Sequence, residues 1–140
     1  VIYNLPYSRQ YPAAGDSALT DGVCGGWTYG DNRWQGTMRD MDVTIDLGSI
    51  KPVHYVGATF LQSVGAWVYM PRRVDIYLSD DGENFTLAGQ AWCDVPDTSA
   101  EIRYKVYSTL CDASARYVRL HAVKYPKRGS WLFTDEIVIN

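Results

Sequence analysis

Apolar and polar residues alternate with a period of two in several short stretches of the chain, which is the pattern of half-buried β-strands. Other stretches of similar length are rich in the β-branched and aromatic residues that favour strands. Together these predicted strands lie at residues 42–48, 54–61, 73–79, 85–90, 101–110, 115–122 and 131–139. No apolar spacing typical of a helix is sustained over three turns. The pattern therefore predicts an all-β chain.

The predicted strands are separated by turns rich in glycine, proline and aspartate, such as the Asp-Gly signal at residues 79–82. Residues 1–17 form an extended lead-in with at most one short strand. Seven or eight short strands of this kind favour an antiparallel sandwich or barrel. The chain has no internal repeat, linker or low-complexity segment, so we expect a single domain spanning residues 1–140.

The stretch from Ser17 to Gly36 contains five glycines, and its pattern predicts neither a strand nor a helix. It nevertheless carries aromatic residues among aspartates and asparagine. Because glycine adopts backbone angles closed to other residues, such a loop can direct several carbonyl oxygens to one point, which suits a hard cation. The alternative is a long surface loop whose tryptophans pack on the body beneath.

Composition excludes several classes of function. The 13 basic residues are scattered and are outnumbered by 16 acidic ones, with a net charge of −3, which disfavours nucleic-acid binding. No apolar run reaches the roughly 18 residues of a membrane helix. Three cysteines permit one disulfide at most; a structural zinc site is not expected, and whether Cys93 pairs with Cys111 stays open. Aromatic residues make up 14% of the chain, which suits strands and binding surfaces.

The sequence shows no arrangement of residues typical of catalysis. The two histidines, His54 and His121, lie in predicted strands and are interpreted as structural. Alternation would place Asp40, Asp42 and Asp46 together on the solvent face of one strand. There is no phosphate-binding loop and no nucleophile motif. We therefore expect a protein that is not an enzyme.

Binding is better supported than catalysis, because three predicted loops combine aromatic rings with planar polar groups. Aromatic rings can stack on sugar rings, and amides and cations can bind the hydroxyls. The residues concerned are Trp34 and Gln35, then Gln62 and Trp67, and finally Tyr125, Lys127 and Arg128. For each ring, the alternative role is packing on the protein itself.

Four motifs that are separated along the chain can be considered together. They are LTDG at residues 19–22, VTIDLG at 43–48, VDIYLSDDGENF at 74–85, and ARYVRL at 115–120 with DEIVI at 135–139. Their order resembles the discoidin-like domains, which include the coagulation-factor C-type domains and carbohydrate-binding module family 32. The details WQG at 34–36, FLQ at 60–62 and WLFTDEI at 131–137 look like modules appended to bacterial glycoside hydrolases, particularly hexosaminidases.

The resemblance implies a jelly-roll-type antiparallel sandwich of the galactose-binding-domain-like kind, with five strands facing three. It also implies a structural calcium. Carried over by position, Asp21 and Glu136 would bind it through their side chains, and Ala18, Val23 and Asp135 through backbone carbonyls; Asn32 falls where the family often has Thr or Ser. Carboxylate and carbonyl oxygens are suitable calcium ligands.

The resemblance further implies a sugar site at the loop end of the sandwich, and a role in bringing an attached hydrolase to glycans. The candidate sugar-binding residues are Trp34, Gln35, Gln62, Trp67, Tyr125 and Arg128. Gln35 replaces the usual histidine, so the ligand is left as a galactose, N-acetylhexosamine or fucose type sugar. We expect a monomer that is secreted, periplasmic or on the bacterial cell surface, and we do not expect membrane binding. The alternative is a structural or protein-protein interaction module with a degenerate sugar site.

Overall fold

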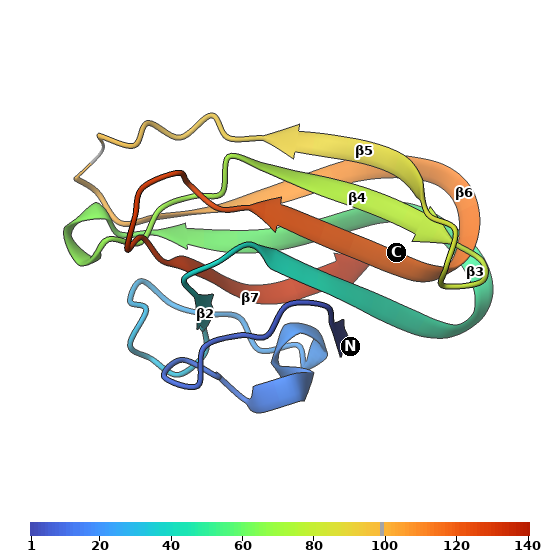
Figure 1. Ribbon diagram of the computed structural model, residues 1–140, viewed down its shortest axis with the longest axis horizontal. Helices are drawn as coiled ribbons and strands as arrows, with labels where there is room; N and C mark the ends of the chain where they lie inside the picture. The colour runs from blue at the N-terminus through green and yellow to red at the C-terminus, as the bar shows by residue number, and fades with distance from the viewer. Residues whose placement is uncertain (99) are drawn as a thin grey trace.

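Two long antiparallel strands, β3 (Met41–Gln62) and β6 (Arg103–Val123), form the centre of the fold. The structure is a computed structural model that describes residues 1–98 and 100–140. The pairing of β3 with β6 is interrupted between Asp46 and Lys51 and again between Val53 and Tyr55. Figure 1 shows both strands turning back on themselves at the same end of the molecule. Each long strand therefore contributes one arm to each of two layers.

The remaining strands extend these two layers. In the first layer, β1 (Ile2–Tyr3) pairs with the first arm of β3, β4 (Arg73–Ser79) pairs with the second arm of β6, and β5 (Thr86–Trp92) pairs with β4. In the second layer, β7 (Leu132–Ile139) pairs with the second arm of β3, and the short β2 (Gln35–Thr37) pairs with β7. The predicted antiparallel β-sandwich is confirmed, although β2 gives the second layer four strands instead of three.

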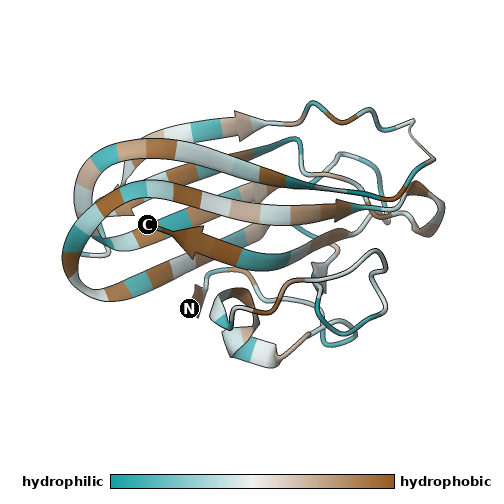
Figure 2. Ribbon diagram, turned by 180° about the vertical axis from the view of Figure 1, so that it is seen from behind, coloured by the Kyte–Doolittle hydropathy of each residue, from teal (hydrophilic) through white to brown (hydrophobic). Residues whose placement is uncertain are grey.

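Apolar side chains from both layers meet in the main core. The alternation along β3, β4 and β6 sends residues such as Val43, Ile76 and Leu120 inward, and Figure 2 shows the matching alternation of hydropathy along the strands. Tyr107 is fully buried here and donates its hydroxyl to the carbonyl of Pro71 at 2.8 Å. Burial raises the pKa of this phenol far above its usual range, so Tyr107 remains neutral at any physiological pH.

A second, smaller core lies where the N-terminal segment and the glycine-rich loop pack against the sandwich. Its fully buried members are Trp34, Leu61, Val68 and Phe133, and Tyr11, Tyr29, Ala66 and Trp131 pack around them. Tyr11 makes edge-on ring contacts with Trp131 and Phe133, with ring centroids 5.1 and 4.9 Å apart. Of the two tryptophans in the predicted irregular loop, Trp34 is thus an interior residue of the fold, whereas Trp27 is exposed.

Several sequence predictions require correction. The predicted strands at 42–48 and 54–61 are parts of one strand, β3, and those at 101–110 and 115–122 are parts of β6. In β3, Gly48 and Pro52 mark a bend of the strand and not its end. Gly48 occupies this bend with φ +86°. The stretch 17–36 is not wholly irregular, since the 3₁₀ helix η1 (Gly15–Thr20) enters it and β2 begins at its end. A second 3₁₀ turn, η2, covers Val64–Ala66.

The prediction that Asp40, Asp42 and Asp46 all face solvent is also wrong, because the N-terminal segment covers part of that strand face. Asp42 is buried, where it accepts two hydrogen bonds from Arg119, at 2.9 and 2.6 Å, and one from Asn4. The strand's alternation is real, but tertiary packing has converted one polar position into an interior ion pair. None of the helices in the described residues is long and apolar enough to cross a membrane.

Candidate functional site

An open pocket of about 370 Å³ lies at the loop end of the sandwich, where β3 and β5 end and β4 begins. We call it the loop-end pocket. Two backbone hydrogen bonds hold its wall together, from the Arg72 amide to the Val123 carbonyl and from the Cys93 amide to the Arg72 carbonyl. The residues that line it are Gln62, Met70, Arg72, Trp92, Cys93, Val95, Pro96, Asp97 and Tyr125.

The loop-end pocket combines exposed aromatic rings with charged planar groups. Trp92 is 58% exposed, and the Arg73 guanidinium lies 5.6 Å from its ring centroid. Tyr125 stacks on Tyr69, with centroids 4.6 Å apart and planes inclined by 14°, and its hydroxyl donates to the Asp97 carboxylate. This acceptor raises the pKa of Tyr125, so its hydroxyl stays protonated as a donor. Arg72 is exposed beside these groups.

A ridge of aromatic and basic side chains continues from the pocket to Trp67. Lys127 donates to the Tyr69 hydroxyl at 3.1 Å, and its ammonium lies 4.3 Å from the Trp67 ring centroid. Trp67 is 48% exposed and adopts φ +63°, a left-handed conformation that is an outlier for a bulky residue. The strained backbone holds the ring at the surface, outside the pocket but connected to it through Lys127 and Tyr69.

Gln62 forms the floor of the pocket instead of an exposed recognition group. Its side chain is buried, donates to the Pro96 carbonyl at 2.9 Å and accepts from the Met70 amide at 3.4 Å. These bonds join the end of β3 to two loops. Because both ends of the amide are already bonded within the protein, Gln62 acts chiefly by positioning the pocket wall.

Trp34 and Gln35 do not reach any open surface. Trp34 is 1% exposed, and its indole N–H donates to the Gly26 carbonyl at 3.0 Å. A Cβ on Gly25 would lie 2.2 Å from the indole, so only glycine permits the loop to cross it so closely. Gln35 donates to the carbonyls of Pro12 and Gly15 and accepts from the Tyr3 hydroxyl. Both side chains therefore fasten the N-terminal segment to the sandwich, and neither can contact a ligand in this conformation.

The basic turn after β6 supplies Tyr125 to the pocket and places Arg128 beyond it. Lys124 braces this turn by donating to the carbonyls of Tyr125 and Lys127 and to the Ser130 hydroxyl. Arg128 is exposed at its tip. Of the six predicted sugar-binding residues, Gln62 and Tyr125 thus line the pocket, and Trp67 lies on the ridge beside it. Arg128 lies at the tip of the turn that carries Tyr125.

The predicted calcium ligands join the glycine-rich loop to the last strand. The Gly22 amide donates to Glu136 Oε2 at 2.7 Å, and the Gly25 amide donates to Asp135 Oδ2 at 2.9 Å. Asp21 lies at the same turn, where its Oδ1 accepts from the Val23 amide. The carboxylates of Asp135 and Glu136 therefore hold together residues more than a hundred positions apart in the sequence, and calcium binding at this junction stays a prediction.

Two carboxylate oxygens at this junction are buried without a hydrogen-bond partner in the described residues: Asp135 Oδ1 and Glu136 Oε1. Burial raises the pKa of both carboxyl groups, and the nearby Asp21 and Asp135 carboxylates add to the rise at Glu136. Such a cluster of buried negative charge is costly unless a cation compensates it. The chemistry of these oxygens therefore fits a calcium ion.

The remaining predicted ligands differ in how well they fit. Ala18 is buried in η1, which packs against β7, and Val23 is exposed in the loop beside Asp21. Asn32 is exposed in a left-handed turn with φ +63°. No group of three or more His, Cys, Asp or Glu side chains in residues 1–98 and 100–140 is arranged to hold a metal ion. A calcium site here would thus depend on backbone carbonyls as well as on Asp21 and Glu136.

Sequence reasoning missed the residues that give the pocket its charged groups and its most exposed ring, namely Arg72, Trp92 and Asp97. Arg72 directly precedes the predicted strand at 73–79, Trp92 follows the one at 85–90, and Asp97 lies in the next loop, after Pro96. Position near a strand end was therefore a signal for Arg72 and Trp92 but not for Asp97. Their convergence depends on which strand ends lie together, which the local pattern does not contain.

Residues considered for other chemistry have structural roles or stand alone. His121 Nε2 lies 3.0 Å from Asp40 Oδ2, whereas His54 is exposed. The three cysteines are free, so Cys93 and Cys111 do not pair in this structure.

Comparison with known proteins identifies the fold and the family. Residues 5–137 match the profile of the F5/8 type C domain. Similar solved structures include the third family 32 carbohydrate-binding module of a family 31 glycoside hydrolase from Clostridium perfringens (TM-score 0.63, 14% identity, covering 99% of this chain and 87% of that one). Another is the family 32 module of NanJ from C. perfringens in complex with galactose (TM-score 0.62, 14% identity, 95% and 87% coverage).

A third similar structure is the C-terminal domain of a chitobiase from Bacteroides fragilis (TM-score 0.61, 15% identity, covering 89% of this chain and 78% of that one). No curated protein sequence matches the chain. Domains of the matched family are non-catalytic binding modules, in agreement with the expectation from sequence. Since the match covers nearly the whole chain, this protein belongs to the F5/8 type C, or discoidin-like, domain family.

Proposed function

We propose that the chain is a carbohydrate-binding module that holds a sugar of the galactose, N-acetylhexosamine or fucose type in the loop-end pocket. The observation that carries the proposal is the exposed Trp92 ring beside Arg72, Asp97 and Tyr125 in one open pocket. Similar modules in solved structures are bound to galactose and to a disaccharide of N-acetylgalactosamine and galactose. Those complexes support the class of ligand proposed here.

The pocket supplies the two kinds of contact that a sugar requires. The Trp92 face is available to the C–H groups of a pyranose ring. Arg72 offers several N–H donors in one plane, and Asp97 offers an acceptor for hydroxyl groups. Because the pocket is open and shallow, we expect weak binding at a single site, so that attachment to multivalent glycans depends on avidity.

The proposed biological role is to bring an attached glycoside hydrolase to its glycan, outside the cell, in the periplasm or at the bacterial cell surface. Two of the similar solved modules come from a family 31 glycoside hydrolase of C. perfringens, which supports that role. A hexosaminidase is the proposed parent enzyme, and the likeness to the chitobiase domain supports it. We propose that the module itself is a monomer.

We further propose that calcium fastens the glycine-rich loop to β7. Asp21 and Glu136 would bind it through their side chains, with backbone carbonyls of Ala18, Val23 and Asp135. When bound, calcium supplies the positive charge that the buried oxygens of Asp135 and Glu136 lack within the chain. Asn32 is the weakest member of the predicted set, because it is exposed, whereas the neighbouring Asp31 accepts from the Gly26 amide of the same loop.

The test is calorimetric titration of the isolated domain with galactose, N-acetylgalactosamine and fucose, in calcium and after chelation. We expect Arg72→Ala and Trp92→Ala to abolish binding, and Trp67→Ala to weaken it. Trp27→Ala is the matched control, because Trp27 is exposed but packs on Tyr104, outside the pocket. Binding that survives Arg72→Ala and Trp92→Ala would overturn the assignment of the pocket. Absence of binding to all glycans would instead favour a protein-protein interaction module.

A further inference from the structure

Two strand edges without a ladder partner lie beside each other on the side of the sandwich. β5 is the last strand in the sheet order, so only β4 pairs with it. The first arm of β6, from Arg103 to Ala115, pairs with β3 alone. The two edges touch where Gly89 faces Thr109: a Cβ on Gly89 would lie 2.2 Å from Thr109 Oγ1. Glycine thus permits close approach at this single point.

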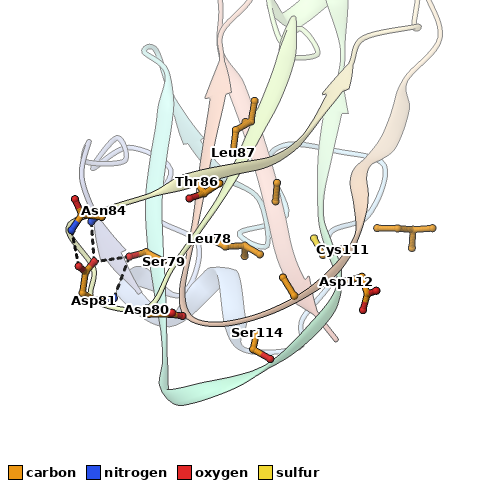
Figure 3. Close-up of a pocket in the computed structure, with 13 residues that line it drawn as sticks. Leu78, Ser79, Asp80, Asp81, Asn84, Thr86, Leu87, Cys111, Asp112 and Ser114 are labelled. Atoms are coloured by element: carbon orange, nitrogen blue, oxygen red, sulfur yellow. Dashed lines mark hydrogen bonds between the residues drawn. The ribbon is translucent and has the colours of Figure 1, made fainter.

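From that contact toward the β4–β5 turn, an open groove of about 490 Å³ separates the two strands. We call it the edge groove, and it lies at the opposite end of β5 from the loop-end pocket. Figure 3 shows Thr86 and Leu87 on one side, Cys111 and Asp112 on the other, and the Asp81 turn closing one end. Its lining residues are Leu78, Ser79, Asp80, Asp81, Asn84, Thr86, Leu87, Ala88, Leu110, Cys111, Asp112, Ala113 and Ser114.

The edge groove combines apolar side chains with hydroxyl groups along its walls, and it is acidic at its rim. Leu110 is 81% exposed and Leu87 is 49% exposed, which is unusual for two leucines beside one groove. Asp80 and Asp112 are exposed at the rim, and neither makes a side-chain hydrogen bond or ion pair in the described residues. No lysine, arginine or aromatic residue belongs to the lining. The groove therefore offers apolar contacts and uncompensated negative charge.

Asp81 differs from the other two carboxylates, because the β4–β5 turn uses it. It accepts hydrogen bonds from the Ser79 hydroxyl, from the Glu83 and Asn84 amides, and from the Asn84 side chain. These bonds lower the pKa of Asp81 well below its usual range. The turn is consequently rigid, and it gives the groove a fixed end.

We propose that the edge groove binds an extended peptide segment of a partner protein, one that alternates apolar residues with lysine or arginine. The segment adds as a strand to the free edge of β5 or β6, so that its backbone pairs with amides and carbonyls that have no ladder partner. Its apolar side chains cover Leu87 and Leu110, and its cations lie over Asp80 and Asp112.

The groove chemistry favours a peptide over the sugar proposed for the opposite end. A sugar site requires an aromatic ring or a planar donor, and the only planar amide in the lining, Asn84, already bonds to Asp81. The unpaired strand edges, in contrast, are the feature that an extended peptide satisfies. This inference is independent of the proposed sugar binding, since the two sites share no residue.

The experiment uses a fluorescent Val-Lys-Val-Lys-Val peptide, followed by anisotropy and by amide hydrogen exchange of the domain. We expect saturable binding, with slower exchange confined to residues 86–88 and 110–113. The matched Val-Glu-Val-Glu-Val peptide should bind at least about tenfold more weakly, because the rim repels it. A Val-Lys-Val-Lys-Val peptide with methylated backbone nitrogens should also bind more weakly, since it cannot complete a ladder.

Variants of the domain distinguish peptide binding in the edge groove from non-specific electrostatic attraction between a basic peptide and an acidic domain. Leu110→Lys and Asp112→Asn should each weaken binding, and both positions are exposed enough to leave the fold intact. Ile50→Lys and Glu83→Gln are the controls, because these exposed residues lie outside the groove. Unchanged affinity in both groove variants, or slower exchange elsewhere than along β5 and β6, would overturn the proposal. Retained glycan binding in the variants shows that the loop end is unaffected.

Discussion

The N-terminal region, residues 1–37, and the loop-end pocket use similar residues for opposite purposes. The first places Trp34 and Gln35 in the interior, where the indole and the amide bond to backbone carbonyls. The second leaves Trp92 and Arg72 exposed at the end of the sandwich. The difference lies in what covers each residue: a glycine-rich loop closes over Trp34, whereas nothing in the described residues closes over Trp92.

This contrast shows why an aromatic residue in a loop is not by itself evidence of a binding surface. Gly25 and Gly26 allow the chain to pass directly over Trp34, and the anchoring carboxylates Asp135 and Glu136 hold it there. The loop after Trp92 is held instead by Gln62, which donates to the Pro96 carbonyl, and this bond leaves the Trp92 ring exposed. A residue can contact a ligand only if its own protein has not already satisfied its polar groups and covered its apolar surface.

The largest expected effect is on the N-terminal region. Trp34→Ala should lower the free energy of unfolding by about 3–5 kcal/mol, because it leaves a cavity among Leu61, Val68 and Phe133. Denaturation in urea measures this change. Trp27→Ala, at an exposed position, should change the stability by no more than about 0.5 kcal/mol. Equal small effects for both would show that the interior packing of Trp34 is not important.

Removal of calcium should have the next largest effect. A cation bound only to the folded state stabilises it by about 2.7 kcal/mol when its concentration is a hundred times the dissociation constant. Chelation should therefore lower the melting temperature, and Glu136→Gln should reduce that response.

Glu83→Gln serves as the control for this calcium experiment, since Glu83 is exposed on the β4–β5 turn far from β7 in the sequence. Thermal melting with calcium and with chelator compares the three proteins. Identical melting of the native domain in both conditions would contradict the proposed calcium site.

A smaller effect, dependent on pH, is expected from the ion pair beneath the N-terminal segment. Burial alone would raise the pKa of Asp42, but hydrogen bonds from Arg119 and Asn4 outweigh burial and lower it. The pair thus stabilises the fold above the ordinary aspartate pKa of about 3.9, and this contribution is lost as the pH falls through the lower folded pKa.

Asp42→Asn tests this interaction, and it should cost about 1–3 kcal/mol at neutral pH. The difference from the native protein should begin to shrink as the pH falls below about 3.9, where Asp42 of the unfolded chain takes up a proton, and it should disappear once the pH is below the lowered pKa of the folded state. Urea denaturation over a range of pH measures it. A difference that is independent of pH would assign the loss to packing instead of charge.

The smallest effect on the free energy of unfolding is expected from a substitution in the loop-end pocket, although the same substitution should abolish sugar binding. Trp92→Ala should change the free energy of unfolding by no more than about 0.5 kcal/mol, because the ring is mostly exposed. It should nevertheless abolish binding of galactose-type sugars in calorimetry. A large loss of stability would place Trp92 with the buried aromatic residues and remove the contrast between the two regions.

The strands could be predicted from sequence, but most of the pocket could not. Alternation at residues 73–79 gives β4 its bounds, since a strand with one buried face repeats every two residues. The Gly22 amide bonds to Glu136, so the motifs at residues 19–22 and 135–139 do lie together, whereas calcium binding by Asp21 and Glu136 stays a prediction. Arg72, Trp92 and Asp97 were missed because they come from separate segments, before β4, at the end of β5 and in the loop after β5, and their proximity depends on the order of strands in the sheet.

The sequence by itself determined an all-β chain, its turns and the family to which it belongs, because these follow from local periodicity and from the order of short motifs. Only the tertiary structure decided that β3 and β6 each continue through a bend into both layers, that Trp34 and Asp42 are interior, and that Trp92 is open. The physical reason is that burial is set by contacts between distant segments. Glycines at 25 and 26 permit close packing over Trp34, but it is the folded sandwich that brings the indole beneath them.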